Sequence, residues 1–211
     1  VVRTLKEVDI IGAEDTRNSI KLLNHFDIKI PMTSYHEFNK YDKAKVLVQE
    51  MLDGKNVALI TDAGTPGISD PGEELVRQCY EAGVEVTSLP GAAACITALT
   101  MSGQKTRRFC FEAFLPKDKK EKSRVLESLK EETRTIIIYE APHRLLKTLK
   151  ELMDVLGSDS DLKCETGVDC RNYGVIDGIP EAKRLLGEMS EVDPEHIIIY
   201  GNSSLNVMFD S

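Results

Sequence analysis

Residues 56–72 read NVALITDAGTPGISDPG, and this stretch decides the fold class. Its first part, Asn56–Thr61, is a continuous apolar run, which is typical of a strand buried on both faces of a parallel sheet. A loop rich in glycine and proline follows. At its end, Asp70, Pro71 and Glu73 fit the N-cap, N1 and N3 positions of a helix. The order of strand, loop and helix predicts a mostly parallel α/β sheet.

The same alternation continues on both sides of this stretch and defines two units joined by a linker at residues 103–107. Hydrophobic periodicity, together with glycine and proline breaks, sets the limits of each expected element. The first unit contains a helix end at Val1–Val8, a strand at Asp9–Ala13, helices through Asn24 and over Lys40–Asp53, a helix from Asp70 to Gly83, a strand at Glu85–Leu89 and a helix at Ala92–Met101. The second contains a strand at Arg108–Phe111, a loop at Glu112–Asp118, a helix at Lys119–Lys130, a strand at Arg134–Glu140 and a helix at Pro142–Leu156. Further on, a loop at Gly157–Asp161, a helix near Ile179–Met189, a strand at His196–Tyr200 and a short helix from Ser203 are expected.

The composition indicates a soluble globular protein, since 41% of the 211 residues are hydrophobic and 29% are charged. Apolar runs such as Thr135–Tyr139 are far shorter than the roughly 20 residues that span a membrane, so no membrane partner is expected. The five cysteines are an odd number without metal-ligand spacing, which indicates reduced thiols in a cytoplasmic protein and no metal site. No signal peptide is visible, although the chain begins at Val1 rather than at methionine.

Charge is segregated along the chain. Residues 1–157 carry 23 Lys+Arg against 24 Asp+Glu, a net charge of −1, whereas residues 158–211 carry 4 against 11, a net charge of −7. Within the first part, Lys105–Arg124 holds eight bases and three acids, a net charge of +5. Such a patch attracts phosphate despite a low overall pI. The alternative interpretation of the same residues is a solvated helix face.

The loop Asp62–Asp70 leaves the carboxyl end of a predicted strand, where ligands bind in open α/β sheets. Its glycines permit a close approach of the backbone to a ligand, and the Asp62 carboxylate could hydrogen-bond an amine or a ribose hydroxyl. The chain has neither a G-x-G-x-x-G fingerprint nor a P-loop, which argues against a dinucleotide or ATP. A tight turn without any ligand fits the pattern equally well, so the pattern alone leaves the ligand open.

Several motifs resemble one family in its order and spacing over residues 1 to about 157. The run Ala58–Gly72 is similar to the signature of the 16S ribosomal RNA cytidine 2′-O-ribose methyltransferases, a branch of the tetrapyrrole methylase superfamily. The collinear matches are AEDTR (Ala13–Arg17), SYHE (Ser34–Glu37), LPGAA (Leu89–Ala93), FEAFLP (Phe111–Pro116) and YEAPHRL (Tyr139–Leu145).

This resemblance implies a two-domain α/β fold with S-adenosylmethionine in the cleft between the domains. Residues 1–104 correspond to a methyl-donor-binding domain that lacks the family's first strand, and residues 107–157 correspond to half of the second domain. A sheet without that strand is expected to be of marginal stability. The donor-binding residues implied are Asp62, Ala63, Gly64, Thr65, Ile68, Ser69, Pro90, Gly91 and Ala92.

The implied reaction is an in-line attack of a ribose 2′-hydroxyl on the donor methyl group, in which positioning is the main tool of catalysis. Glu14, Asp15 and Glu140 are candidate bases at strand ends, and Arg17 could hold a phosphate. Each carboxylate could equally be a helix cap or a surface group. Contacts with 16S rRNA in the small ribosomal subunit are assigned to Arg107, Arg108, Lys117, Lys119, Lys120, Lys122, Arg124, His143 and Arg144.

The end of the chain departs from this pattern. Residues 166–211 resemble the N-terminal part of a fold-type I pyridoxal-phosphate aminotransferase of the aspartate aminotransferase kind, through Gly167–Leu185 and Ile197–Asp210. In that family, the turn matched by Gly201–Ser204 precedes a helix N-terminus near the cofactor phosphate. The Schiff-base lysine lies far downstream, so no pyridoxal phosphate is expected here. The charge change near residue 158 falls at the same junction, so residues 158–211 are interpreted as a foreign acidic tail in a fusion.

The sequence leaves alternatives open. The chain could be a catalytically inactive fusion fragment that retains RNA binding or binds a partner, including a second copy in a homodimer. It could also be another tetrapyrrole-methylase-family enzyme, acting on a tetrapyrrole or on the precursor of diphthamide. An aminotransferase ranks last, because no candidate Schiff-base lysine follows the tail motif.

Overall fold

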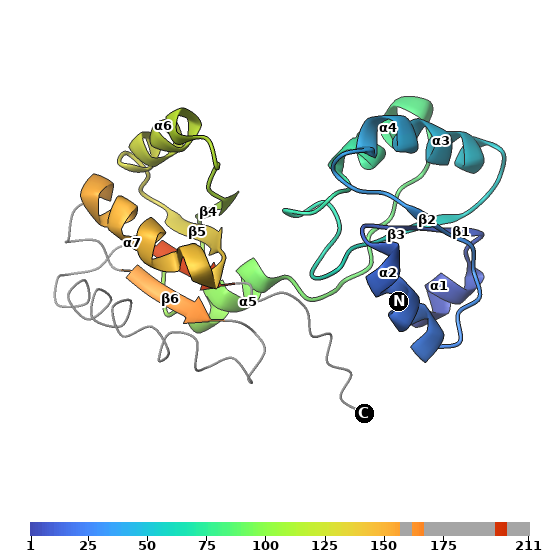
Figure 1. Cartoon of the computed structure of the whole chain (residues 1–211), viewed down its shortest axis with the longest axis horizontal. Helices are drawn as coiled ribbons and strands as arrows, with labels where there is room; N and C mark the ends of the chain where they lie inside the picture. Colours follow the sequence, from blue (N-terminus) through green and yellow to red (C-terminus); the bar gives the residue numbers. More distant parts are fainter. Residues whose placement is uncertain (157–161, 167–196, 202–211) are drawn as a thin grey trace. The chain divides into compact units, whose positions relative to one another are not determined.

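The computed structural model describes residues 1–156, 162–166 and 197–201, and the chain divides into two compact units, Val1–Ala92 and Ala93–Ser211 (Figure 1). Both units combine parallel strands with helices, which confirms the α/β class. The division lies before the linker expected at residues 103–107. The reason is that helix α5 (Ala94–Met101), which the sequence analysis placed in the first unit, packs in the core of the second.

The first unit contains a three-stranded parallel sheet of β1 (Ile10–Ala13), β2 (Met32–Ser34) and β3 (Val57–Ile60), in the order β2-β1-β3. Ala13 pairs with Ser34 on one side and with Ile60 on the other, so all three carboxyl ends lie at one edge. β1 and β3 confirm predicted strands. β2 was not expected, because its three residues carry no apolar alternation.

Helices cover both faces of this sheet (Figure 1). α1 (Val2–Glu7) and α2 (Thr16–His25) pack on one face, where Leu5 and Leu23 are buried with Ile11. On the other face, α3 (Lys40–Leu52) and α4 (Glu73–Ala82) bury Leu47 and Leu75 around Tyr35. α1, α2 and α3 follow the predicted limits to within about two residues, because each has a continuous apolar stripe.

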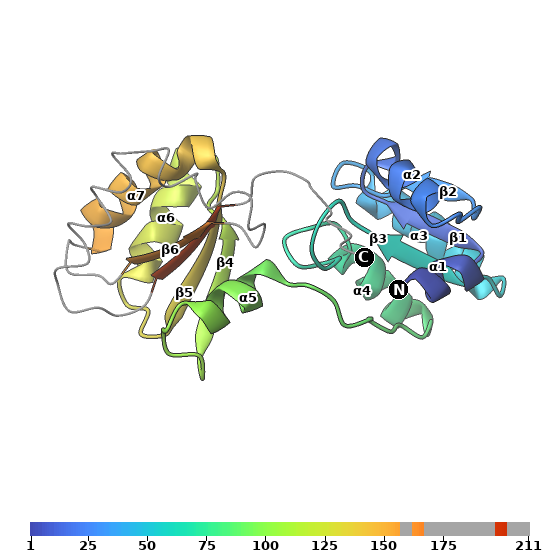
Figure 2. The same cartoon turned by 90° about the horizontal axis from the view of Figure 1, so that it is seen from below.

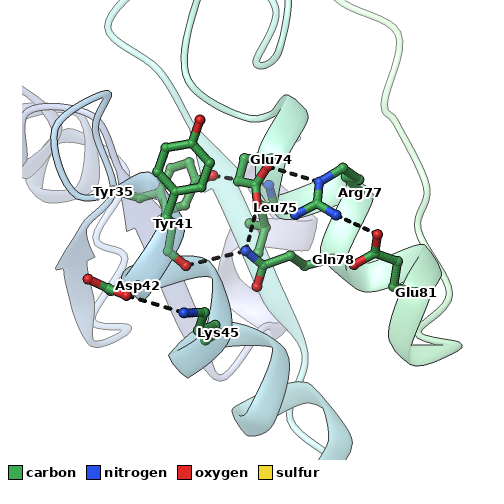
Figure 3. Close-up of polar contacts among 9 residues, drawn as sticks. All are labelled: Tyr35, Tyr41, Asp42, Lys45, Glu74, Leu75, Arg77, Gln78 and Glu81. Atoms are coloured by element: carbon green, nitrogen blue, oxygen red, sulfur yellow. Dashed lines mark hydrogen bonds and ion pairs between the residues drawn. The ribbon is translucent and has the colours of Figure 1, made fainter.

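Polar contacts fix the position of α4 against β2 and α3 (Figure 3). The fully buried Tyr35 accepts a hydrogen bond on its hydroxyl oxygen from the backbone N–H of Leu75 at 3.1 Å. The Gln78 side chain donates to the Tyr41 carbonyl at 3.3 Å and to a Glu74 carboxylate oxygen at 2.6 Å. The helix that follows the glycine-rich loop is therefore anchored at its start.

The expected capping of α4 is wrong in detail. The helix begins at Glu73 with Gly72 as its N-cap, and Asp70 lies in the preceding loop instead of capping the helix. The loop folds back on itself here, so that a Cβ on Gly72 would lie 2.7 Å from the Gly67 nitrogen. Only glycine fits at such a distance. At the other end, Gly83 adopts the left-handed conformation predicted for a helix C-terminus, with φ of 72°.

Two further expectations about the first unit are wrong. Residues 85–89 form no strand, although Val84 and Val86 do pack against the Tyr35 cluster. β3 is only partly buried at all four positions, whereas burial on both faces was expected. Both differences have one cause, because within residues 1–92 no further strand pairs with β3, and a strand forms and is covered only beside a partner.

The second unit contains a parallel sheet of β4 (Phe109–Phe114), β5 (Thr135–Glu140), β6 (Leu162–Thr166) and β7 (Ile197–Gly201), in the order β4-β5-β7-β6. β4 is longer than predicted and takes up part of the expected loop, with an irregularity between Phe111 and Ala113. β7 confirms the strand expected at His196–Tyr200, whereas β6 was not expected.

β5 is the centre of this unit and is buried at all six positions. Ile136 and Ile138 face the cluster formed with α6 (Lys119–Leu129) and α7 (Pro142–Leu156). Ile137 and Tyr139 face α5 on the other side (Figure 2). The Tyr139 hydroxyl oxygen also accepts a hydrogen bond from the backbone N–H of Cys95 at 2.9 Å. The described helices of this unit, α5, α6 and α7, match the predicted limits to within about two residues.

Some expectations fall outside the described residues. These are the loop at Gly157–Asp161, the helix near Ile179–Met189, the turn residues Asn202–Ser204 and the short helix from Ser203. Among the described residues, Cys79, Cys95 and Cys110 are free thiols. No described helix has the length and apolar character of a membrane span.

Candidate functional site

Polar side chains follow all three strands of the first unit at their common carboxyl edge. The ladder continues for one step beyond the strands, because Tyr35 N–H donates to the Ala13 carbonyl at 2.8 Å and Glu14 N–H donates to the Ile60 carbonyl at 3.3 Å. Glu14 leaves the central strand. His36 and Asp62 leave the two strands that flank it. This edge is where the topology of an open α/β sheet places a ligand.

Asp62 is held in place on one side and left unsatisfied on the other. Its Oδ2 accepts a hydrogen bond from Asn18 Nδ2 at 3.0 Å, and its N–H donates to Glu14 Oε2 at 3.3 Å. Its Oδ1 is buried and has no hydrogen-bond partner within the described part of the chain. Most buried polar atoms are hydrogen-bonded, so an unpaired carboxylate oxygen at this edge points to a ligand or a water. Asn18 was not predicted, because its contact spans 44 residues.

The loop after Asp62 is shaped by backbone that only a few residue types adopt. Gly64 and Gly67 have φ of 74° and 80°, and Ser69 adopts φ of 62°. The Thr65 hydroxyl donates to the Ala92 carbonyl at 3.1 Å, which brings the two predicted donor-binding segments together. The predicted residues that are exposed in these segments are Ala63, Gly64, Ile68, Ser69, Pro90, Gly91 and Ala92.

Asp70 belongs to this edge and not to the helix cap. It is half-buried, and burial together with the charges of Glu14 and Asp62 raises the pKa of the Asp70 carboxyl to about 6. The neighbouring Thr61 hydroxyl opposes this rise in pKa. Three carboxylates therefore share the edge, which suits a positively charged ligand. The sequence signal for Asp70 was misread, because Asp followed by Pro-Gly is also a normal helix start.

Asp15 and Arg17 form a hydrogen-bonded ion pair with each other at the start of α2. Asp15 is the N-cap, and its Oδ1 accepts from Arg17 N–H at 2.9 Å and from Arg17 Nε at 3.0 Å. The Arg17 hydrogen bonds lower the pKa of the Asp15 carboxyl to about 2. A carboxyl with so low a pKa is a poor proton acceptor at neutral pH. The Arg17 side chain is 87% exposed, so its guanidinium is both fixed and accessible.

Glu140, the third predicted base, lies in the core of the second unit. Its side chain is 1% exposed, and its Oε1 accepts from Ala141 N–H at 2.7 Å and from Arg144 Nε at 2.8 Å. Its Oε2 accepts from the Thr148 hydroxyl at 2.6 Å. Both oxygens are occupied, so this carboxylate fixes the start of α7 and orients Arg144.

The predicted RNA-contacting residues are mostly exposed. Lys122 differs from the others, because it forms an ion pair with Glu151 and its side chain is 17% exposed. Arg144 is 30% exposed and is held by Glu140. Phe109 and Phe111 pack against the α5 cluster, whereas Phe114 is exposed. The exposed members are Arg107, Arg108, Lys117, Lys119, Lys120, Arg124 and His143. Among the described residues, no group of histidine, cysteine or acidic side chains is arranged to hold a metal ion.

Comparisons with known proteins match this chain to two families. The family described as Tetrapyrrole (Corrin/Porphyrin) Methylases matches residues 1–163, and the family described as Aspartate amino-transferase matches residues 142–211. The two matches overlap at α7, so the change of family falls within the second unit.

Curated relatives named ribosomal RNA small subunit methyltransferase I share about half of the aligned residues. The protein from Synechocystis is 52% identical over 161 residues, which cover 76% of this chain and 58% of that protein. The protein from Haemophilus influenzae is 52% identical over 158 residues, 75% of this chain and 56% of that protein. The protein from Bacillus subtilis is 48% identical over 156 residues, which cover 74% of this chain and 53% of that protein. The chain thus spans just over half the length of the curated relatives it matches.

Proposed function

The chain belongs to the tetrapyrrole (corrin/porphyrin) methylase family, and on that premise we propose that it transfers a methyl group from S-adenosylmethionine to 16S rRNA. The acceptor we propose is the ribose 2′-hydroxyl of a cytidine in the small ribosomal subunit. The names and the identity of the relatives support the substrate class. The observation that carries the proposal is the carboxyl edge of the first unit, where Asp62 presents a buried oxygen that no described residue pairs with.

The residues at this edge fit the chemistry of the donor. S-adenosylmethionine carries an ammonium group, a positively charged sulfur and two ribose hydroxyls, and the edge offers the carboxylates of Glu14, Asp62 and Asp70. We assign to Asp62 a hydrogen bond with the amine or a ribose hydroxyl. The exposed loops Ala63–Ser69 and Pro90–Ala92 would lie against the donor. When bound, the donor supplies an electrophilic methyl group.

Of the three predicted bases, we assign removal of the hydroxyl proton to Glu14. Asp15 is weakened as a base by Arg17, and both oxygens of Glu140 are occupied in the core. Glu14 is only partly buried and accepts one long hydrogen bond, from Asp62 N–H at 3.3 Å. A positioned base typically contributes about 10²–10⁴-fold to the rate.

We assign RNA binding to fixed or exposed cations in each unit. In the first, Arg17 presents a guanidinium that Asp15 already orients, which suits a phosphate. In the second, the exposed basic residues around β4 and the start of α6 would contact the RNA backbone. Such contacts position the RNA without reading its sequence.

Titration calorimetry with S-adenosylmethionine tests the donor assignment, and methyl incorporation into small ribosomal subunits that lack the modification tests the acceptor. We expect saturable heat and a stoichiometric transfer of methyl groups. Absence of heat at millimolar donor would refute the proposal. It would favour a second candidate, a chain that binds RNA or a protein partner without methyl transfer. The match of residues 142–211 to a second family supports this alternative.

A further inference from the structure

His36 is a polar residue at the carboxyl edge that the proposed reaction does not use. It lies two residues beyond the end of β2 and is partly buried. Its Nδ1 is buried and has no hydrogen-bond partner within the residues that the structure describes. Because buried side-chain nitrogens are usually paired, this atom calls for a partner from outside the described residues, such as a ligand.

A rigid turn holds the imidazole where it is. His36 N–H donates to Asn39 Oδ1 at 2.8 Å, and Asn39 N–H donates back to the His36 carbonyl at 3.0 Å. Asn39 Nδ2 also donates to the Ser34 carbonyl at 3.3 Å, which ties the turn to the end of β2. On the ring itself, Phe38 makes an edge contact with a centroid distance of 6.0 Å. The unpaired nitrogen is therefore presented by a fixed backbone.

The turn belongs to the same edge as the proposed donor site. Ser34 pairs with Ala13, the residue before Glu14, and Tyr35 N–H continues this pairing. Asp62 leaves β3 on the other side of β1. The two unpaired buried atoms, His36 Nδ1 and Asp62 Oδ1, thus flank the central strand at one end of the sheet. Two such atoms at one edge indicate a ligand that offers several hydroxyl or amine groups.

We propose that His36 Nδ1 makes a hydrogen bond with a ribose hydroxyl of a ligand bound at this edge. The inference rests on the proposed function, which supplies two sources of that group, the ribose of S-adenosylmethionine and the ribose of the acceptor nucleotide. A ring nitrogen of imidazole either accepts the O–H or donates to the hydroxyl oxygen, depending on its tautomer. His36 is in this role a binding residue and takes no part in bond making.

Three substitutions at position 36 distinguish a binding role of the Nδ1 atom from a structural role of the side chain. In His36→Asn, a polar side-chain atom takes the place of Nδ1. In His36→Gln, the polar group instead reaches toward the position of Nε2, and His36→Ala removes both. Loss of one hydrogen bond to a ligand weakens affinity roughly tenfold. We expect this loss in the Ala and Gln variants and recovery to within about threefold of the unaltered chain in the Asn variant.

Two measurements distinguish the source of the ribose. If the donor supplies it, the dissociation constant for S-adenosylmethionine rises in the Ala and Gln variants. If the acceptor supplies it, the affinity for the donor is unchanged in these variants. The unaltered chain then binds an RNA oligonucleotide more tightly than the same oligonucleotide with 2′-deoxycytidine, and the Ala and Gln variants bind the two equally. ¹⁵N NMR of the histidine side chains in the unaltered chain gives a direct readout, because the Nδ1 resonance shifts on addition of the ligand.

The inference is overturned if the unaltered chain binds both probes while Nδ1 does not shift and all three variants bind as tightly as it does. The proposed function survives that result. If the unaltered chain binds neither probe, the proposed function fails and this inference fails with it. The NMR titration needs no variant, so a substitution that unfolds the protein does not obscure the outcome.

Discussion

The two units end their central strands with the same residue type in opposite states. Glu140 closes β5 and is 1% exposed, with hydrogen bonds from Ala141, Arg144 and Thr148 to its two oxygens. Glu14 follows β1 and is partly exposed. Among the described residues, its side chain accepts only the 3.3 Å hydrogen bond from Asp62, which itself keeps an unpaired oxygen. The carboxylate at the end of β5 is satisfied within the second unit. The edge of the first leaves them available for a ligand.

The strands of the two sheets also differ in burial. β5 is buried at all six positions between α5 on one face and α6 and α7 on the other. β3, by contrast, is partly exposed at all four. We therefore expect substitutions at the edge of the second unit to act mainly on stability and those at the edge of the first to act mainly on binding. Substitutions in each unit test this division, from the largest expected effect to the smallest.

Glu140→Ala removes a buried carboxylate and leaves Arg144 without its partner. Breaking a buried ion pair from one side typically costs about 3–5 kcal/mol of unfolding free energy. Glu14→Ala is the matched variant, and we expect it to cost less than about 1 kcal/mol, since only one long hydrogen bond is lost. Urea denaturation measures both values. Equal losses in the two variants would contradict the division.

Ile198→Pro tests how far the tail supports the second unit. β7 lies between β5 and β6, and Ile198 pairs with Ile137 on one side and Lys163 on the other. Proline removes a backbone donor from the middle of the sheet, which we expect to cost about 2–4 kcal/mol. Hydrogen exchange should accelerate at β5 amides and not at β1 amides. Ile198→Val keeps the backbone donor and serves as the control. Unchanged exchange at β5 would show that β7 contributes little.

Asp62→Ala is the corresponding test of the first unit. It removes the unpaired oxygen together with the acceptor of the Asn18 hydrogen bond. Loss of a charge-assisted hydrogen bond to a cationic ligand weakens binding by about 1.5–3 kcal/mol, roughly 10- to 150-fold in the dissociation constant for S-adenosylmethionine. Asn18→Ala keeps the carboxylate and frees it, so a smaller loss is expected. If calorimetry finds unchanged affinity in Asp62→Ala, the donor does not bind at this edge.

Reversing the charge of Lys119 and Lys120 tests the basic patch. Both side chains are exposed at the start of α6, so the substitutions leave the core unchanged. We expect weaker binding to RNA and a weaker dependence of affinity on salt. The slope of the logarithm of the binding constant against the logarithm of the salt concentration should fall in magnitude by about 1 for each phosphate that the variant no longer neutralises. Reversal of Lys6 and Lys45, which are exposed on α1 and α3, is the control for a general change in charge. An unchanged salt slope would exclude the patch from the RNA interface.

The sequence predicted those features that a local pattern determines. β5 and α7 carry their own apolar periodicity, and both limits were predicted to within a residue. β2 and residues 85–89 depend instead on whether a neighbouring strand pairs with them, which no local pattern records. The first therefore appeared as an unexpected strand, and the second was wrongly predicted to be one.

The candidate site divides in the same way. Asp62 and Glu14 follow strands, so topology alone placed them at one edge. The partners that decide the role of each carboxylate are side chains from other elements or from the next turn of a helix. Arg17 lowers the pKa of Asp15, and Arg144 and Thr148 occupy Glu140. The position of an acid at a strand end does not by itself distinguish these groups from Glu14.

The carboxylates at the carboxyl edge lower the stability of the first unit at neutral pH, and Asp70 shows by how much. Burial and the charges of Glu14 and Asp62 raise the pKa of its carboxyl from 3.8 to about 6, so the folded state binds a proton more readily than the unfolded chain between those values. This contribution to stability is therefore present at low pH and is lost as the pH rises through about 6. Because the side chain is only half-buried, solvent screening reduces the expected cost at pH 7 to about 1 kcal/mol.

Asp70→Asn keeps the size and polarity of the side chain but cannot ionise. We expect its unfolding free energy to exceed that of the unaltered chain by about 1 kcal/mol at pH 7 and by little at pH 4. Glu14→Gln should reduce this pH dependence, since the Glu14 charge is one cause of the raised pKa. Denaturation curves at the two pH values measure the difference. A gain of equal size at both would mean that the carboxylates of the first unit do not repel one another, and that this edge is no more strained than that of the second.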